Sequence, residues 1–308
     1  MEEVLHTFSK ELCGCLERIF VNLEQIEEIR IRIDRPVEVI RCGQSSFIPY
    51  IVGEEEGQQI LSKLSQYSIY TIEEELKKGY ITIKGGHRVG LAGRVVTEGG
   101  HVKMIRDVAS YNFRIAREKI GISENYSSYL YDGTWKNTMI IGAPQAGKTT
   151  LLRDFARLMS MGNNRLNIHP IKVGIVDERS EITGCVKGVP QYTFGERIDV
   201  LDACPKAEGM MMLVRSMSPS VILVDEIGKK EDVEAVMEAI FAGVQLIVTV
   251  HGYSLEDVKR RPSLQPLFLQ GAFQRFIEMS NVPLPGTVVN VKDVKGDSLL
   301  FKGMVNKR

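Results

Sequence analysis

The chain has 308 residues, and its 39 basic side chains balance its 39 acidic ones, so the formal net charge is zero. This length predicts about two domains. Apolar residues make up 44% of the chain and charged residues 25%, which excludes a disordered, collagen-like or low-complexity protein. A net charge of zero argues against a protein that coats nucleic acid through bulk positive charge, so we expect no nucleic-acid partner.

The sequence predicts neither a membrane span nor a signal peptide. No apolar run approaches the roughly 20 residues that a transmembrane helix needs, and the longest one, 239–250, is interrupted by Gly243 and Gln245. The first six residues are acidic and lack the basic start and apolar core of a signal peptide. We therefore expect a cytoplasmic protein that does not insert into a membrane and reaches one only through a partner.

The first part of the chain alternates between helical and extended patterns. Apolar residues at three- and four-residue steps predict an amphipathic helix over residues 1–20. Residues 27–33 then change to a period of two, with isoleucines on one side and arginines on the other, which is typical of a strand. The remaining predicted elements are a strand over 37–40, helices over 54–66 and 70–78, and short strands over 80–84, 88–97 and 101–105. Double glycines separate these last three strands, as in hairpins, so we predict a smaller N-terminal α+β domain over residues 1–133.

The pattern changes at Thr138, where short and fully apolar runs of the kind found in buried parallel strands begin. These runs cover 139–141, 173–176, 221–224 and 246–250, and helical stretches over 149–158 and 231–241 separate some of them. Strands that alternate with helices imply a parallel sheet with right-handed crossovers. We therefore predict a second domain of the α/β class over residues 134–308, with a boundary that rests on the change of period alone.

Residues 142–149 match the phosphate-binding loop pattern G-x-x-x-x-G-K-[ST], and they follow an apolar strand and open a helix. Glycines let consecutive backbone N–H groups turn toward one anion, and the N-terminus of the helix adds a partial positive charge. Lys148 can reach the β- and γ-phosphates of a nucleotide, and the Thr149 hydroxyl can bind Mg²⁺. The predicted nucleotide-binding residues are Gly142, Ala143, Pro144, Gln145, Ala146, Gly147, Lys148, Thr149 and Thr150.

A second nucleotide motif follows the run 221–224, where Asp225 and Glu226 stand at the end of a predicted strand. We predict that Asp225 holds Mg²⁺ through its water shell and that Glu226 polarises the attacking water. The cation needs hard oxygen ligands, and the water needs a proton acceptor. The alternative for this pair taken alone is a buried strand that ends in a solvated acidic turn.

Two further strand ends carry polar residues. Asp177 and Glu178 follow one apolar run, and ligands of parallel α/β sheets sit at the carboxyl ends of strands. Both carboxylates are therefore expected near the phosphate loop, where they would position water or Mg²⁺. The alternative is a surface ion-pair cluster with Arg179. His251 ends another run and is predicted to sense the γ-phosphate.

The predicted catalytic residues are Glu226, Glu178, Asp177, Lys148 and His251. No Asn-Lys-x-Asp motif of the kind that reads guanine follows the strands. We therefore favour ATP over GTP, with Mg²⁺ as the metal cofactor, held by Thr149 and Asp225.

With these motifs identified, the chain resembles the stage III AA family of sporulation ATPases of endospore-forming bacteria, which is related to the secretion and pilus ATPases of type II and type IV systems. The resemblance covers almost the whole chain. The stretches that carry it are 28–32 with Arg35 and Pro36, then 86–94, 105–117, 176–182 and 224–228.

The resemblance implies a C-terminal RecA-like P-loop ATPase domain behind the smaller N-terminal α+β domain. It also implies that Asp177, Glu178 and Glu181 correspond to an acidic box of the superfamily and His251 to a histidine box. The second motif of the superfamily usually has Gly-Glu, whereas this chain has Asp-Glu, so only Glu226 carries over. Arginines complete the site in that superfamily, and the candidates in this chain are Arg106, Arg114, Arg117 and Arg215.

The resemblance further implies a ring oligomer, a homo-hexamer, that powers assembly of or transport through a channel between mother cell and forespore. An integral membrane partner would hold it at the mother-cell membrane. Two alternatives stay open at this point. One is a nucleic-acid-dependent RecA-like motor, supported only by the basic pairs 229–230 and 259–261. The other is a nucleotide-binding scaffold with negligible turnover.

Overall fold

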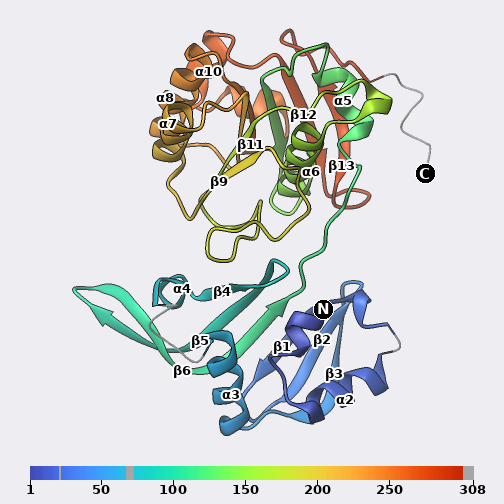
Figure 1. Cartoon of the computed structure of the whole chain (residues 1–308), viewed down its shortest axis with the longest axis vertical. Coiled ribbons are helices and arrows are strands. Elements are labelled where there is room, and N and C mark those ends of the chain that lie inside the picture. The colour runs from blue at the N-terminus through green and yellow to red at the C-terminus, as the bar shows by residue number, and fades with distance from the viewer. Residues whose placement is uncertain (21, 67–72, 301–308) are drawn as a thin grey trace. The chain divides into compact units, whose positions relative to one another are not determined.

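The computed structural model describes residues 1–20, 22–66 and 73–300 (Figure 1). The chain divides into two compact units, of which the first holds residues 1–117 with 184–187 and the second holds 118–183 and the chain from 188 on. The division after Arg117 comes earlier than the predicted boundary at 133/134. In the described part of the chain, no helix combines the length and the apolar character that a membrane span requires.

The N-terminal unit is built on a six-stranded antiparallel sheet in the order β3-β2-β1-β6-β5-β4. Its strands are β1 (Ile26–Arg32), β2 (Pro36–Arg41), β3 (Gln44–Ile51), β4 (Tyr80–Ile83), β5 (His87–Glu98) and β6 (His101–Arg114). Its helices are α1 (Glu2–Leu5), α2 (Lys10–Ile19), α3 (Glu54–Leu64) and α4 (Glu73–Lys78). The predicted alternation in the first strand is confirmed, because Ile29 and Ile31 are fully buried while the arginines beside them are partly exposed.

Three N-terminal predictions differ from the structure. The single helix over 1–20 is wrong, because the Ser9 side chain caps a new helix by accepting a hydrogen bond from the Leu12 N–H at 3.1 Å. Strand β3 was not predicted, and β6 continues to Arg114 instead of ending at residue 105. An irregular register around Gly93 disturbs the period of two in β5 and β6, which hides the length of the hairpin in the sequence. Part of the predicted helix over 70–78, residues 70–72, lies outside the described residues.

The C-terminal unit contains a seven-stranded sheet in the order β13-β12-β7-β11-β10-β8-β9. Only the edge pair β12–β13 is antiparallel. The strands are β7 (Thr138–Gly142), β8 (Val173–Asp177), β9 (Ile198–Asp202), β10 (Val221–Val224), β11 (Gln245–His251), β12 (Arg275–Ser280) and β13 (Thr287–Lys292). The helices are α5 (Glu124–Leu130), α6 (Lys148–Met161), α7 (Lys206–Ser216), α8 (Lys230–Phe241), α9 (Leu255–Lys259) and α10 (Gln265–Leu269).

Helices cover both faces of this sheet. The core on one face includes residues of α7, α8 and α10, and the core on the other includes residues of α5 and α6 (Figure 1). The four apolar runs and both helices predicted for this part are present. Strands β9, β12 and β13 and helices α5, α7 and α10 were not predicted. Gly209 lies within α7, although glycine disfavours helices and so obscures this helix in the sequence. A Cβ at this position would lie 2.5 Å from Val176 of β8, so the helix packs too closely on the strand for any side chain.

The segment 118–133 belongs to the C-terminal unit because a buried carboxylate holds it. Asp154 of α6 is 3% exposed and accepts hydrogen bonds from the backbone N–H groups of Gly121 (3.1 Å) and Ser123 (2.7 Å). Its carboxylate also accepts from the Ser123 hydroxyl at 2.7 Å and from Arg157 Nε at 2.6 Å. Burial disfavours the ionised form, but these donors outweigh burial, and the pKa of Asp154 is lowered.

We expect Asp154→Ala to lower the free energy of unfolding by about 3 kcal/mol, because it leaves Arg157 and two N–H groups without their buried partner. Since the folded-state pKa is the lower one, the contribution of Asp154 is present above the unfolded-state pKa of about 3.9 and is lost as the pH falls through the folded-state pKa. Urea unfolding at neutral and acidic pH measures both effects. Asp132→Ala, which removes the exposed partner of Lys136, serves as the control, and an equal loss in both variants would contradict the anchoring role.

Candidate functional site

The site lies at the carboxyl edge of the C-terminal sheet, where three strand ends share one row. Gly142 at the end of β7 is paired with His251 of β11 on one side and with Met279 of β12 on the other. Every residue of β7 is buried, and the chain then turns into the phosphate loop. Gln145 (φ 62°) and Gly147 (φ 87°) adopt left-handed backbone conformations before α6 begins at Lys148. Turns of this kind direct backbone N–H groups toward one point, as anion binding requires.

Lys148 is held inside this loop. It is 6% exposed, and its ammonium group donates hydrogen bonds to the carbonyl oxygens of Gly142 and Ala143, both at 2.9 Å. Its Nζ also lies 3.1 Å from Nδ1 of His251. Burial lowers the pKa of Lys148, and the nearby carboxylates of Asp225 and Glu226 act in the opposite direction without cancelling that effect. All three donors of the ammonium group are in use, so a bound phosphate would replace these protein partners.

Thr149 and Asp225 form the oxygen pair predicted for a metal ion. The Thr149 hydroxyl donates to one carboxylate oxygen of Asp225 at 2.6 Å, and the Thr249 hydroxyl donates to the other. Thr249 Oγ1 in turn accepts a hydrogen bond from the backbone N–H of Glu226 at 2.8 Å. Within the described ranges, no group of three His, Cys, Asp or Glu side chains could hold a metal. The Thr149 hydroxyl and the single carboxylate of Asp225 fit Mg²⁺, which binds through one or two carboxylates, with phosphate oxygens and water as its other ligands.

Glu226 contacts both His251 and Arg179 through its carboxylate. Its Oε1 lies 3.0 Å from Nε2 of His251, and its Oε2 accepts from Arg179 at 3.0 Å. An ammonium group can only donate, so Nδ1 of His251 accepts from Lys148 and Nε2 carries the proton that points to Glu226. Lys148, His251, Glu226 and Arg179 thus form one continuous chain of polar contacts.

The two carboxylates predicted after β8 are placed elsewhere. Asp177 is 2% exposed and accepts hydrogen bonds from the backbone N–H groups of Glu181, Ile182 and Thr183 and from the Thr183 hydroxyl, at 2.8–3.0 Å. Glu178 forms an ion pair with Lys206 at 2.8 Å. These partners hold both side chains, so neither lines the cavity at the phosphate loop, although Arg179 and Glu181 of the same turn do. The geometry gives Asp177 the role of shaping the 178–183 turn.

A cavity of about 340 Å³ surrounds the phosphate loop. It is lined by residues 144–150 and by Arg179, Glu181, Asp225, Glu226 and His251. Of the residues predicted for catalysis, Lys148, Glu226 and His251 meet here, while Asp177 and Glu178 do not line it. Sequence reasoning missed Arg179 as a neighbour of Glu226 and Thr249 as the support of Asp225. A hydroxyl residue within the apolar run before His251 was the available signal for Thr249.

The four candidate arginines lie in different surroundings. Arg114 pairs with Glu28 at 3.7 Å, and Arg117 donates to the carbonyl oxygens of Glu24 and Ile26. Arg215 lies in the last turn of α7, shortly before β10 begins. It is therefore at the amino edge of the sheet, opposite the carboxyl edge that carries the phosphate loop. Arg106 is exposed, and its side chain makes no hydrogen bond or ion pair within the described residues.

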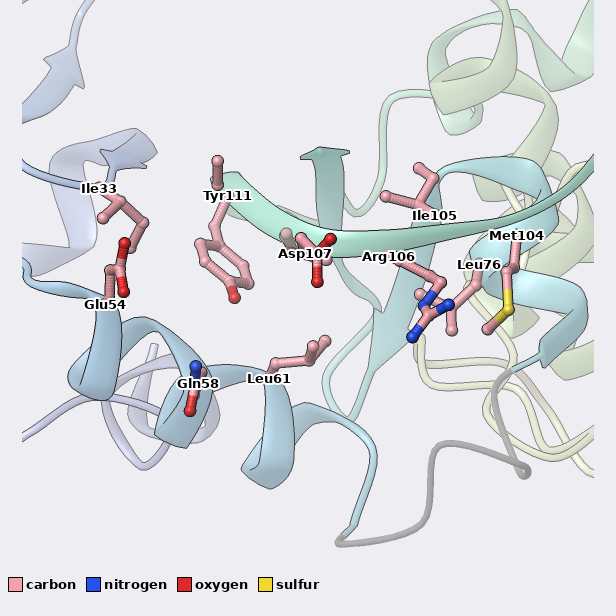
Figure 2. A pocket seen from close by; sticks show the side chains of 12 residues that line it. Ile33, Glu54, Gln58, Leu61, Leu76, Met104, Ile105, Arg106, Asp107 and Tyr111 are labelled. Carbon is pink, nitrogen blue, oxygen red and sulfur yellow. The ribbon is translucent and has the colours of Figure 1, made fainter. Parts of the chain in front are cut away.

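A larger cavity of about 640 Å³ lies in the N-terminal unit, between α3, α4 and β6. Figure 2 shows Leu61 and Gln58 of α3 on one side of it and Tyr111 and Asp107 of β6 on the other. Its lining is mixed apolar and polar, without a nucleophile–base pair or a phosphate-binding turn. We therefore place the candidate active site at the smaller cavity, where the reactive groups converge.

The sequence is similar to a protein family and to individual known proteins. A family model described as "Sporulation stage III, protein AA" matches residues 1–299. The chain is 60% identical over 275 residues to Stage III sporulation protein AA of Bacillus subtilis (strain 168), an overlap of 89% of each chain. It is 32% identical over 156 residues to Protein SEEDLING PLASTID DEVELOPMENT 1 of Arabidopsis thaliana, which is 50% of this chain and 22% of that protein.

Two solved structures share the fold. The ATPase DotB of Yersinia pseudotuberculosis has a TM-score of 0.59 at 17% identity, with 88% of this chain and 75% of that chain covered. The pilus retraction motor PilT with bound ADP has a TM-score of 0.59 at 18% identity, with 86% and 77% covered. The predicted α/β class is confirmed, with a RecA-like fold in the C-terminal domain and a separate N-terminal domain before it in the sequence.

We expect Thr249→Val to cost about 1–3 kcal/mol of stability, because it removes one hydrogen bond to Asp225 and leaves the Glu226 N–H unpaired. We also expect it to raise the Mg²⁺ concentration that nucleotide binding requires, since Asp225 loses its orientation. Thermal unfolding and an Mg²⁺ titration measure the two effects. Thr138→Val is the matched control, because Thr138 is also fully buried on a strand and its hydroxyl donates only to the Lys136 carbonyl. An unchanged Mg²⁺ requirement in Thr249→Val would show that Thr249 does not orient the metal site.

Proposed function

The chain belongs to the Sporulation stage III, protein AA family, and on that premise we propose that it is an Mg²⁺-dependent ATPase. Its proposed role is to power assembly of, or transport through, a channel between mother cell and forespore. Family membership and the secretion-ATPase fold support this role. The single observation that carries the activity is the polar chain from Lys148 through His251 to Glu226 around one cavity of about 340 Å³.

In the proposed reaction, the backbone N–H groups of the phosphate loop bind the β-phosphate, and Lys148 turns from the Gly142 and Ala143 carbonyls to the β- and γ-phosphates. Thr149 and Asp225 hold Mg²⁺, which would neutralise charge on the phosphate oxygens when bound. Glu226 accepts the proton of the attacking water as the bond between the γ-phosphorus and the bridging oxygen breaks. The products are ADP and inorganic phosphate.

His251 and Arg179 position Glu226 in this proposal. Both oxygens of its carboxylate are fixed by these two partners at 3.0 Å. A γ-phosphate that draws Lys148 away from His251 would free Nδ1 and change the contact that Nε2 makes with Glu226. His251 is therefore proposed as the γ-phosphate sensor that reports to Glu226. Asp177 and Glu178 are assigned no chemical step, because neither lines the cavity.

We expect Glu226→Gln to bind ATP as the unaltered protein does and to hydrolyse it about 10²–10⁴-fold more slowly, because the amide cannot accept the proton. Lys148→Ala is expected to lose ATP binding, since Lys148 supplies the buried ammonium group inside the loop. Equilibrium binding of ATP and release of phosphate measure the two properties separately, with the exposed Glu231→Gln as control. Undiminished turnover in Lys148→Ala would contradict the site. Binding of ATP to the unaltered protein without phosphate release would favour the scaffold alternative.

We further propose a ring of six copies that an integral membrane partner holds at the mother-cell membrane, with an arginine of a neighbouring copy completing each site. Arg106 is the preferred candidate because it has no partner within the described residues, whereas Arg114 and Arg117 are engaged. A cation placed beside the γ-phosphate stabilises charge in the transition state.

We expect the mass in solution to rise to that of a hexamer when ATP and Mg²⁺ are added to the Glu226→Gln variant, which is expected to consume the nucleotide far more slowly. Light scattering coupled to size-exclusion chromatography measures this mass. A monomer under all conditions would contradict the ring. ATP hydrolysis that requires added DNA would instead favour the nucleic-acid-dependent motor.

A further inference from the structure

The loop that follows β12 is hydrogen-bonded to the backbone of the phosphate loop. This loop, residues 281–286, has the sequence Asn-Val-Pro-Leu-Pro-Gly. The Gly286 N–H donates to the Ala146 carbonyl at 3.0 Å, and the Asn281 side-chain amide donates to the Pro144 carbonyl at 3.2 Å. The approach is close, because a Cβ on Gly147 would lie 2.9 Å from Cα of Gly286. The 281–286 loop is thus a fixed neighbour of the phosphate site.

The sheet places this loop on the side of the phosphate site away from the reactive groups. His251 and Met279 pair with Gly142 from opposite sides, and Met279 leads directly into the 281–286 loop. Asp225 and Glu226 follow β10, which lies beyond β11 on the His251 side. A nucleotide whose γ-phosphate points toward His251 and Glu226 therefore extends its ribose and base toward the 281–286 loop.

The surface of the 281–286 loop suits a flat aromatic ring. Val282 is 75% exposed and Leu284 is 67% exposed, although both side chains are apolar. Two prolines, Pro283 and Pro285, restrict the backbone between and after them, so the side chains are presented from a stiff segment. Base-binding sites combine apolar contact with a small number of polar groups that fix orientation.

The polar groups of the loop are mostly acceptors. Prolines have no N–H, the Val282 N–H already donates to the Ser280 hydroxyl at 3.0 Å, and the Gly286 N–H is bound to Ala146. Within the described residues, the carbonyl groups of Val282, Pro283 and Pro285 accept no hydrogen bond. Adenine carries an amine, a donor, at the position where guanine carries a carbonyl oxygen. The Leu284 N–H is also unpaired within the described residues, but the three free carbonyl groups outnumber it, so the loop favours the amine of adenine over the carbonyl oxygen of guanine.

We propose that the 281–286 loop is the base-binding part of the nucleotide site, in which Val282 and Leu284 pack against the adenine ring and the free carbonyl groups accept hydrogen bonds from its amine. This inference rests on the proposed ATPase function. The loop would select ATP among nucleoside triphosphates, while the residues proposed to bind the phosphates keep their roles.

The test compares ligands with and without a base. Calorimetric affinities for ATP, GTP and inorganic tripolyphosphate, each with Mg²⁺, are measured for the unaltered protein and for the double variant Val282→Ser with Leu284→Ser. We expect the double variant to bind ATP at least about tenfold more weakly, because two apolar contacts with the ring are lost, while its affinity for tripolyphosphate stays the same. Leu269→Ser is the matched control, since Leu269 is 86% exposed and lies at the end of α10.

Several results would overturn the inference. Unchanged ATP affinity in the double variant would place the base elsewhere, and a parallel loss of ATP and tripolyphosphate affinity would show that the loop only supports the phosphate loop. Equal affinity of the unaltered protein for ATP and GTP would contradict the proposal that the free carbonyl groups select adenine. If the unaltered protein binds neither ATP nor tripolyphosphate, the proposed ATPase function itself fails, which is a distinct outcome.

Discussion

The buried, parallel centre of the C-terminal sheet is the constraint on which the site depends. All residues of β7 and β10 are buried, as are the five central residues of β11. Charged groups cannot be placed in such strands without a partner, so they occur where the strands end. The parallel register then sets Val224 beside Val248 and His251 beside Gly142, which brings the reactive groups to one edge.

The groups at this edge depend on one another. Lys148 uses His251 as a partner, His251 contacts Glu226, and Glu226 also holds Arg179. Asp225 is fixed separately by two hydroxyl groups, those of Thr149 and Thr249. In the proposed reaction these two arrangements have different tasks, because the first responds to the γ-phosphate and the second keeps the metal ligand in place.

Sequence reasoning located most of this site, and its errors have a common cause. The phosphate loop, Asp225, Glu226 and His251 were predicted because each follows an apolar run, and the strand ends bring them together. Asp177 also ends such a run, but its carboxylate accepts hydrogen bonds from the backbone N–H groups of residues 181–183. A local pattern shows that a carboxylate ends a strand. It does not show which way that side chain points, and here Asp177 faces its own turn while Arg179 and Glu181 of the same turn line the cavity.

The sequence by itself determined the α/β class, the phosphate loop motif and four of the buried strands, because these depend on short-range periodicity and on residue types at fixed spacing. The tertiary structure decided the remainder. It assigned residues 118–133 to the C-terminal unit through Asp154, it paired Glu226 with Arg179, and it set the 281–286 loop against the phosphate loop. Each of these contacts joins segments that are separated in the chain, and no local pattern encodes which separated segments meet.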